Sequence, residues 1–265
     1  MASTLAIISS NKIDQRFALL RATRRKALVC YVTSGYPSEV QCLELLRGLE
    51  TEGADIIEIG VPFSDPIADG PVIQDSSQKA LAAGMTLEKT LEIVSRADLT
   101  VPVVLFTYLN PLLAAGPDVL ERASAAGVDG ILLTDLPVGA DPDREKWLGD
   151  SDLAFIRLVA PTTPVDRMRE IALNGSGFVY LISRLGVTGA QSSLASELRE
   201  TSDRLRSATD LPIYVGFGIS NGEQARAAAS AADGVVVGSA LVKAAGESID
   251  KALSLTRSLR TALDS

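Results

Sequence analysis

Residues 55–71 read DIIEIGVPFSDPIADGP, a β-branched apolar run that contains Glu58 and leads into an acidic loop. Such a run is typical of a buried strand, in which an unpaired charged carboxylate is costly. Glu58 is therefore expected either to perform acid–base chemistry or to pair with a buried lysine or arginine. The residues of the run leave both interpretations open.

The loop after this run carries two more carboxylates, Asp65 and Asp69. Three prolines restrict its conformations, and Gly70 permits a sharp turn. We interpret Asp65 as a turn or capping residue. Asp69 can face the same ligand as Glu58, because both residues belong to one strand–loop unit.

The overall composition argues against several classes of partner. The chain has 265 residues, 46% of them apolar, which fits one domain over residues 1–265. A formal net charge of −8 argues against nucleic acid, and no apolar run approaches the ~18 residues of a membrane span. Two cysteines are too few for a disulfide framework, so we expect a cytoplasmic protein. The plastid stroma is the expectation for a photosynthetic eukaryote, although no transit peptide is recognised.

The sequence contains no histidine. This excludes Ser-His-Asp and Cys-His catalysis, and it leaves a metal site with little support beyond magnesium held by oxygen atoms alone. Acid–base chemistry therefore falls to carboxylate, tyrosine, lysine or cysteine side chains.

Short apolar runs alternate with amphipathic stretches along the chain. We predict strands over residues 27–32, 55–59, 101–106, 130–134, 153–159, 177–182, 213–215 and 234–237. We predict helices over residues 39–52, 86–97, 118–126, 141–148, 165–173, 194–207, 221–231 and 248–263. Near-continuous apolar strands favour a parallel sheet covered by helices, so eight units predict an α/β fold, a single (β/α)8 TIM barrel. Residues 12–24 are predicted to form an extra N-terminal helix over the barrel bottom, and a doubly wound sheet is the alternative fold.

Glycine-rich loops follow the last three predicted strands. They contain Gly189, Gly218 and the pair Gly238-Ser239. Glycines let backbone amides approach a phosphate group, and Gly238-Ser239 is predicted to open a short helix whose N-terminal amides favour an anion. Together these loops predict a phosphorylated small molecule, whereas Gly216-Phe217-Gly218 lacks the spacing of a dinucleotide fingerprint.

Side chains at other strand ends are candidates for the rest of the pocket, although each also suits ordinary core. These candidates are Tyr31, Phe106, Tyr108, Leu132 and Leu158. The hydroxyl of Tyr180 needs a partner if it is buried, and this partner is ligand, Glu58 or a purely structural group. Arg157 interrupts the fifth strand and is expected to extend outward between helices.

These motifs together resemble the tryptophan synthase alpha subunit family, in family order and over roughly residues 17–243. The most specific segments are PFSDPIADGP at 62–71 and GVTG at 186–189. They are supported by LFTYLNP at 105–111, DLP at 135–137, APTTP at 160–164 and the late glycine loops. The resemblance implies reversible retro-aldol cleavage of indole-3-glycerol phosphate to indole and glyceraldehyde 3-phosphate, without a metal or organic cofactor.

The resemblance also implies roles for individual residues. Glu58 matches the acid–base group that moves the protons, and Asp69 matches the carboxylate that binds the indole N–H and stabilises its developing charge. Burial is expected to keep Glu58 near an operating pKa, while a more polar loop keeps Asp69 ionised. Tyr180 matches a pocket hydroxyl, and Thr188 matches a threonine that couples closure of the loop after strand six to Asp69. The other matched positions are Gly189, Gly218, Gly238 and Ser239 for phosphate and Tyr31 and Phe106 for indole.

The implied partner is a beta subunit that contains pyridoxal phosphate (PLP), in an αββα assembly that passes indole through a tunnel. This chain itself has no implied PLP lysine. Two departures from the family, Asp75 and Leu185, bear on partner affinity and loop dynamics. The alternatives are a stand-alone lyase that releases indole, a phosphate-sugar isomerase or epimerase, and a binding subunit that only activates its partner.

Overall fold

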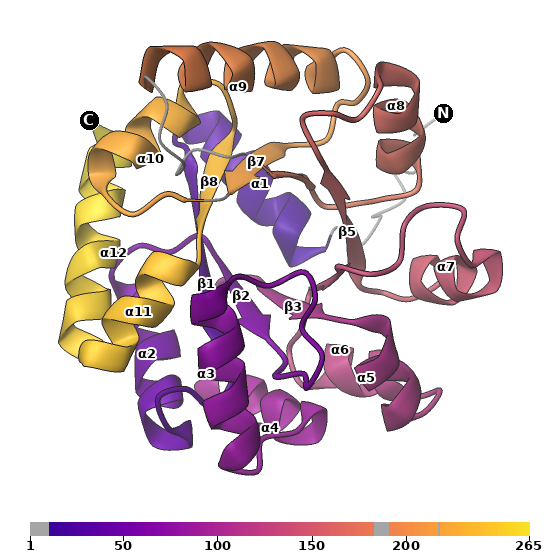
Figure 1. Cartoon of the computed structure of the whole chain (residues 1–265), viewed down its shortest axis with the longest axis vertical. Coiled ribbons are helices and arrows are strands. Elements are labelled where there is room, and N and C mark those ends of the chain that lie inside the picture. Colours follow the sequence, from indigo (N-terminus) through magenta and orange to yellow (C-terminus); the bar gives the residue numbers. More distant parts are fainter. Residues whose placement is uncertain (1–10, 183–190, 217) are drawn as a thin grey trace, which may run out of the picture.

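Eight parallel strands form a closed barrel in the order of the sequence, with helices around it (Figure 1). The strands are β1 Ala27–Thr33, β2 Ile56–Gly60, β3 Val103–Thr107, β4 Gly130–Leu133, β5 Ala154–Val159, β6 Val179–Ile182, β7 Ile213–Gly216 and β8 Gly234–Val237. Strand β1 pairs with β8 through Ala27 and Gly234, which closes the sheet. The predicted barrel is therefore confirmed, and the doubly wound alternative is wrong.

The computed structural model describes residues 11–182, 191–216 and 218–265, except for the side chains of residues 191–195. The helices in these ranges are α1 Lys12–Thr23, α2 Glu39–Thr51, α3 Pro71–Ala82, α4 Leu87–Ala97, α5 Leu109–Ala115, α6 Val119–Ala125, α7 Pro142–Gly149, α8 Val165–Leu173, α9 Gln191–Arg206, α10 Gly222–Ala229, α11 Ser239–Glu247 and α12 Ile249–Asp264. None of these helices is both long enough and apolar enough to cross a membrane.

Polar side chains fix where many of the helices begin. The side chains of Ser38, Thr86, Asp141, Asn221 and Ser248 each accept a hydrogen bond from a backbone N–H in the first turn of the following helix. Such caps satisfy N–H groups that have no partner within the helix. The sequence therefore sets these helix starts locally, while the apolar faces set the packing.

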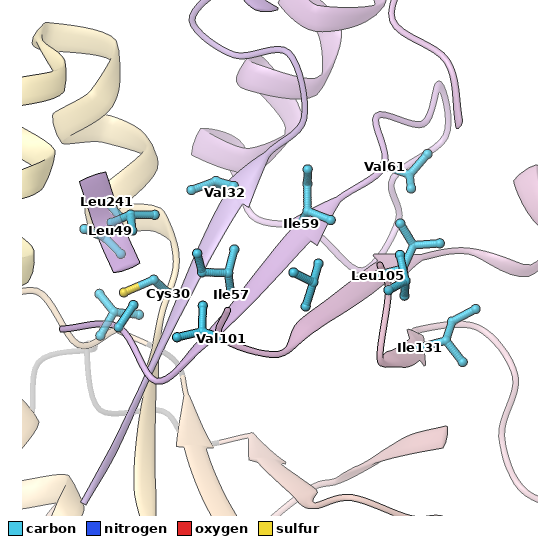
Figure 2. Packing of buried hydrophobic residues seen from close by; sticks show 14 of the residues in the cluster. Cys30, Val32, Leu49, Ile57, Ile59, Val61, Val101, Leu105, Ile131 and Leu241 are labelled. Atoms are coloured by element: carbon cyan, nitrogen blue, oxygen red, sulfur yellow. The ribbon is translucent and has the colours of Figure 1, made fainter. Parts of the chain in front are cut away.

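The strands separate two apolar layers, because alternate side chains point to opposite sides of a strand. The outer layer lies between the strands and the helices, and Figure 2 shows part of it, with Cys30, Ile57 and Leu105 on neighbouring strands. The inner layer fills the barrel with side chains such as Val29 and Val104. The strands therefore read as continuous apolar runs rather than as alternating patterns.

Helix α1 covers the N-terminal end of the barrel, as the sequence predicts. Its Ile13 and Leu20 are buried and belong to the same cluster as the barrel interior. Asn11 caps the helix and also donates a hydrogen bond from Nδ2 to the Asp129 carbonyl, at 2.7 Å. The helix ends at Thr23, because Arg24 adopts a left-handed conformation with φ 55°.

Helices α3 and α5 differ from the sequence analysis, which assigns no helix to either segment. Helix α3 begins with Pro71 and α5 has Pro111 in its first turn, positions at which a helix tolerates proline but at which a sequence suggests a loop. The other predicted elements are present, most with ends shifted by one to three residues. Helix α3 matters most, since it begins directly after the acidic loop.

Arg157 in β5 is oriented outward, as expected, but its charge does not reach solvent. Its side chain is 5% exposed, and its guanidinium pairs with Glu145 at 2.8 Å and donates to the carbonyls of Leu136 and Asn174. It also lies 3.8 Å from the centre of the Phe155 ring. Arg157 is thus a structural residue that ties α7 to β5.

Candidate active site

Glu58 lies near the C-terminal end of β2 with its side chain turned into the barrel. Its neighbours in register are Tyr31 on β1 and Val104 on β3. It is 1% exposed, and its Oε1 has no hydrogen-bond partner among the described residues. The structure therefore does not support a structural ion pair for Glu58, the alternative that the sequence left open.

Burial raises the pKa of Glu58 to about 8. Desolvation disfavours the charged form, and no described hydrogen-bond donor or cation offsets this effect. A carboxyl group with such a pKa can both donate and accept a proton near neutral pH.

Asp69 lies in the loop between β2 and α3 and is anchored from both sides. The Tyr108 hydroxyl donates a hydrogen bond to Asp69 Oδ2 at 2.8 Å and accepts one from the Ala68 N–H at 3.1 Å. Gln74 of α3 donates from Nε2 to the Asp69 carbonyl at 2.8 Å. The Tyr108 ring is held in turn by Phe63, with ring centres 5.0 Å apart.

Asp69 is more buried than the sequence analysis expects of a polar loop. Burial raises its pKa, and the hydrogen bond from Tyr108 opposes this rise. The same two factors cause the contrast with Glu58, which is more deeply buried and lacks such a donor. Tyr108, predicted as an apolar pocket residue, acts here through its hydroxyl and orients Asp69.

Tyr31 links the two carboxyl groups in space. Burial chiefly raises the pKa of its phenol, and the negative charges of Asp69 and Glu58 both add to the rise. Both carboxyl groups therefore lie within electrostatic reach of one tyrosine. Burial and the charge of Glu58 likewise raise the pKa of Tyr180 from the opposite side of the barrel.

The predicted apolar pocket residues converge around these groups. Tyr31 packs edge-on against Phe106, with ring centres 5.2 Å apart. Phe106, Leu132, Leu158 and Tyr180 belong to the apolar cluster inside the barrel. Leu132 is buried, whereas the other three are half-buried at the C-terminal end of the strands. Five strands thus contribute to one apolar wall beside Glu58.

Two glycines make room for the tyrosine hydroxyls in this wall. A Cβ atom on Gly60 would lie 2.0 Å from the Tyr31 hydroxyl, and one on Gly216 would lie 2.1 Å from the Tyr180 hydroxyl. Any side chain there would displace a phenol. Sequence reasoning assigned Gly216 to a phosphate loop and did not assign Gly60, although a glycine at a strand end is the signal for such a close approach.

The described part of the predicted phosphate site lies at the ends of β7 and β8. Gly218 is exposed with φ 77°, a left-handed conformation that suits glycine. Gly238 precedes α11 without any side-chain cap, and Ser239 is the first residue of that helix. The amides of its first turn are not capped by a side chain, an arrangement that favours an anion. Thr188 and Gly189 lie outside the described residues.

The structure adds three side chains to this end of the barrel that sequence reasoning missed. Ile73 of α3 and Val242 of α11 pack with Tyr31, and Thr134 follows β4 with a buried hydroxyl that has no partner among the described residues. Among the described residues, no group of three acidic or cysteine side chains is placed to hold a metal ion. The site as described can hold a flat apolar group beside two carboxyl groups, with an anion near α11.

Comparisons with known proteins agree with this geometry. Residues 17–264 match the family model of the tryptophan synthase alpha chain. The tryptophan synthase alpha chain of Desulfatibacillum aliphaticivorans is 47% identical over 242 residues, which are 90% of this chain and 91% of that protein.

Solved structures give the same result. Tryptophan synthase subunit alpha from Legionella pneumophila superposes with a TM-score of 0.88 at 34% identity, covering 96% of this chain and 99% of that one. A chain of tryptophan synthase from M. tuberculosis, in its aminoacrylate-bound form, gives a TM-score of 0.87 at 32% identity, covering 96% and 100%. With this match of sequence and barrel, the chain belongs to the tryptophan synthase alpha chain family.

Proposed function

We propose that Glu58 and Asp69 carry the reaction of this family, the reversible cleavage of indole-3-glycerol phosphate to indole and glyceraldehyde 3-phosphate. The observation that carries the proposal is the buried carboxyl group of Glu58 near the C-terminal end of β2, whose Oε1 has no hydrogen-bond partner among the described residues. Catalytic groups of such barrels lie at this end.

The proton transfers suit one carboxyl group with a raised pKa. Glu58 donates a proton to C3 of the indole ring, and it takes the proton of the C3′ hydroxyl as the bond between these two carbons breaks. The hydroxyl-bearing carbon becomes the aldehyde, and the bonding electrons return to the ring. Glu58 thus ends the cycle in its initial protonation state.

Asp69 accepts a hydrogen bond from the indole N–H and stabilises the positive charge that forms on the protonated ring. Its hydrogen bond from Tyr108 fixes the direction of the carboxylate before substrate binds. The indole ring lies against the wall formed by Tyr31, Phe106 and Leu132, and the Tyr180 hydroxyl faces the reacting carbon atoms. The phosphate binds the first turn of α11 at Gly238 and Ser239, with Gly218, Thr188 and Gly189 contributing from the neighbouring loops.

The natural assembly in this proposal is an αββα tetramer in the cytoplasm. The beta subunits hold PLP and receive indole, whereas this chain needs no cofactor. Its membership of the alpha chain family implies the beta partner. We further propose that residues 1–265 form one domain, because β1 and β8 come from opposite ends of the chain and pair with each other.

The test is indole release from indole-3-glycerol phosphate, with and without a tryptophan synthase beta subunit. We expect slow release by the chain alone and a sharp rise with the beta subunit, and both rates should depend on Glu58. The Glu58→Gln variant tests that dependence, and Glu44→Gln, an exposed glutamate on α2, is the matched control. Fast release whose rate does not change with the beta subunit would instead indicate a stand-alone lyase. An unchanged rate of release by the Glu58→Gln variant would overturn the catalytic assignment.

A further inference from the structure

A cavity of about 710 Å³ opens at the opposite, N-terminal end of the barrel. It lies beside the C-terminal half of α1, next to the starts of β1, β7 and β8. No residue of the candidate active site lines it. Its size falls within the range of ordinary small-molecule sites, roughly 300–1,000 Å³.

The charge of this cavity is opposite to that of the chain. Its lining contains five cationic side chains and two carboxylates, a net charge of +3 within a chain of net charge −8. The five cationic side chains are Arg21, Arg24, Arg25, Lys26 and Arg206. A concave basic surface concentrates anions even when the whole protein is acidic.

Two of these cations have no partner among the described residues. Arg25 pairs with Asp264 at 3.2 Å, and Arg206 pairs with Asp233 at 3.1 Å. The side chains of Arg21 and Arg24, by contrast, form no ion pair or hydrogen bond with the described part of the chain. Two guanidinium groups that line one cavity and have no partner in the described ranges suit a dianion, since each can donate two parallel hydrogen bonds to phosphate oxygens.

The lining of the cavity also includes one buried polar side chain. Tyr214 of β7 lines it, is fully buried, and has a hydroxyl without any hydrogen-bond partner among the described residues. The ring is fixed by Phe178, with centres 4.5 Å apart. A buried hydroxyl without a partner is costly, and a ligand oxygen at the inner end of the cavity would satisfy it.

We propose that this cavity is a second ligand site that binds a small organic phosphate. Arg21 and Arg24 hold the phosphate group, and Phe17 and Leu20 on the same helix contact the apolar part of the ligand. The Tyr214 hydroxyl donates a hydrogen bond to the ligand at the inner end. Because the cavity contacts α1 and the starts of three strands, its ligand would also fasten α1 to the barrel.

The test uses 1-naphthyl phosphate as the probe and 1-naphthol as its neutral counterpart, with isothermal titration calorimetry on the full chain. We expect the phosphate to bind and naphthol to bind at least about tenfold more weakly. Raising the salt concentration should weaken binding of the phosphate, because exposed charges are screened.

Variants then locate the bound probe. Arg21→Gln/Arg24→Gln should weaken binding by about tenfold or more, through the loss of charged hydrogen bonds. Tyr214→Phe keeps the ring and should weaken binding by about threefold. The control Arg169→Gln/Arg226→Gln removes the same charge from exposed positions on α8 and α10, outside the cavity, and should leave affinity unchanged.

Two results would overturn the proposal. One is the absence of measurable binding of 1-naphthyl phosphate to the wild-type chain. The other is equal affinity for wild type and Arg21→Gln/Arg24→Gln, which would place the probe at the catalytic end instead. Circular dichroism of each variant confirms that it is folded, so that lost binding reports on the cavity.

Discussion

Two buried carboxyl groups, one directly before β2 and one within it, have different surroundings. Asp55, directly before the strand, pairs with Arg260 at 3.0 Å and accepts a hydrogen bond from the Leu28 N–H at 2.9 Å. Glu58, three residues later, has an Oε1 without any partner among the described residues. Burial raises the pKa of both groups, but only for Asp55 do a backbone N–H and nearby arginines oppose the rise.

In this fold, one of these carboxyl groups stabilises the structure and the other is available for proton transfer. Asp55, directly before the strand, joins β1, β2 and α12 through its hydrogen bonds with Leu28 and Arg260. Glu58, within the strand, has an Oε1 without a partner in the described part of the chain, which is unfavourable for folding but leaves the proton available. A structural and a chemical carboxyl group therefore lie close together in the sequence, and five experiments test this difference.

The largest expected effect is on catalysis. Glu58→Gln should lower kcat for indole release by about 10³-fold, equivalent to roughly 4 kcal/mol in activation free energy, because the amide cannot transfer a proton. Its free energy of unfolding should not fall, since an uncharged amide is easier to bury. Steady-state kinetics and urea denaturation measure the two quantities, and a marked loss of stability would show that Glu58, like Asp55, holds the fold together.

Asp55→Asn should show the reverse pattern. Removing the charge leaves the buried Arg260 paired with Asp264 alone, which should lower the free energy of unfolding by about 2 to 3 kcal/mol. The kcat of the folded variant should stay close to that of wild type. Stable folding of Asp55→Asn, followed in urea, would show that this pair does not hold the barrel together.

Tyr108→Phe tests how the second carboxyl group of the site is held. Loss of the hydrogen bond to Asp69 should lower kcat/KM about tenfold to thirtyfold, roughly 2 kcal/mol. The acidic limb of the pH–rate profile should also move to higher pH, because that hydrogen bond opposes the rise in the pKa of Asp69. In an Asp69→Asn background the same change should have little further effect, and a full additional loss would contradict this role.

The pH dependence of stability tests the environment of Glu58. The folded state holds the pKa of Glu58 at about 8, against an ordinary 4.5, so it binds more protons than the unfolded state between these values. The contribution of Glu58 to the free energy of unfolding should therefore decrease as pH rises through this window, by at most about 1.4 kcal/mol per unit. Glu58→Gln should lack this decrease, and parallel curves for the two proteins would contradict the raised pKa.

The smallest effect is expected at an exposed carboxylate. Asp75 of α3 pairs with Lys79 at 2.7 Å, and both side chains are more than half exposed. Such pairs contribute little, so the urea midpoint of Asp75→Asn should match that of wild type. A marked loss of stability would mean that the exposed Asp75 contributes to stability as the buried Asp55 does, which the comparison does not predict.

Much of the architecture follows from local signals in the sequence. The helix over 165–173 and the strand over 234–237 have the predicted bounds, because apolar periodicity and turn residues mark both ends. The sequence analysis assigns no helix to α3 or α5, because each has a proline in its first turn and such a proline resembles a loop signal. At the site, the sequence identified the strand-end side chains but not Gly60, Ile73, Thr134 or Val242, which acquire a role only through their neighbours in space.

The sequence by itself determined the barrel, the family and the two candidate carboxyl groups, because each depends on a local pattern or a short motif. Only the tertiary structure decided which buried acid is paired. Asp55 and Arg260 are 205 residues apart, and Asp69 and Tyr108 are 39 apart, so no local pattern relates them. The charge state of a buried carboxyl group depends on partners within a few ångströms, and closure of the barrel brings these partners to Asp55 but brings none to the Oε1 of Glu58 among the described residues.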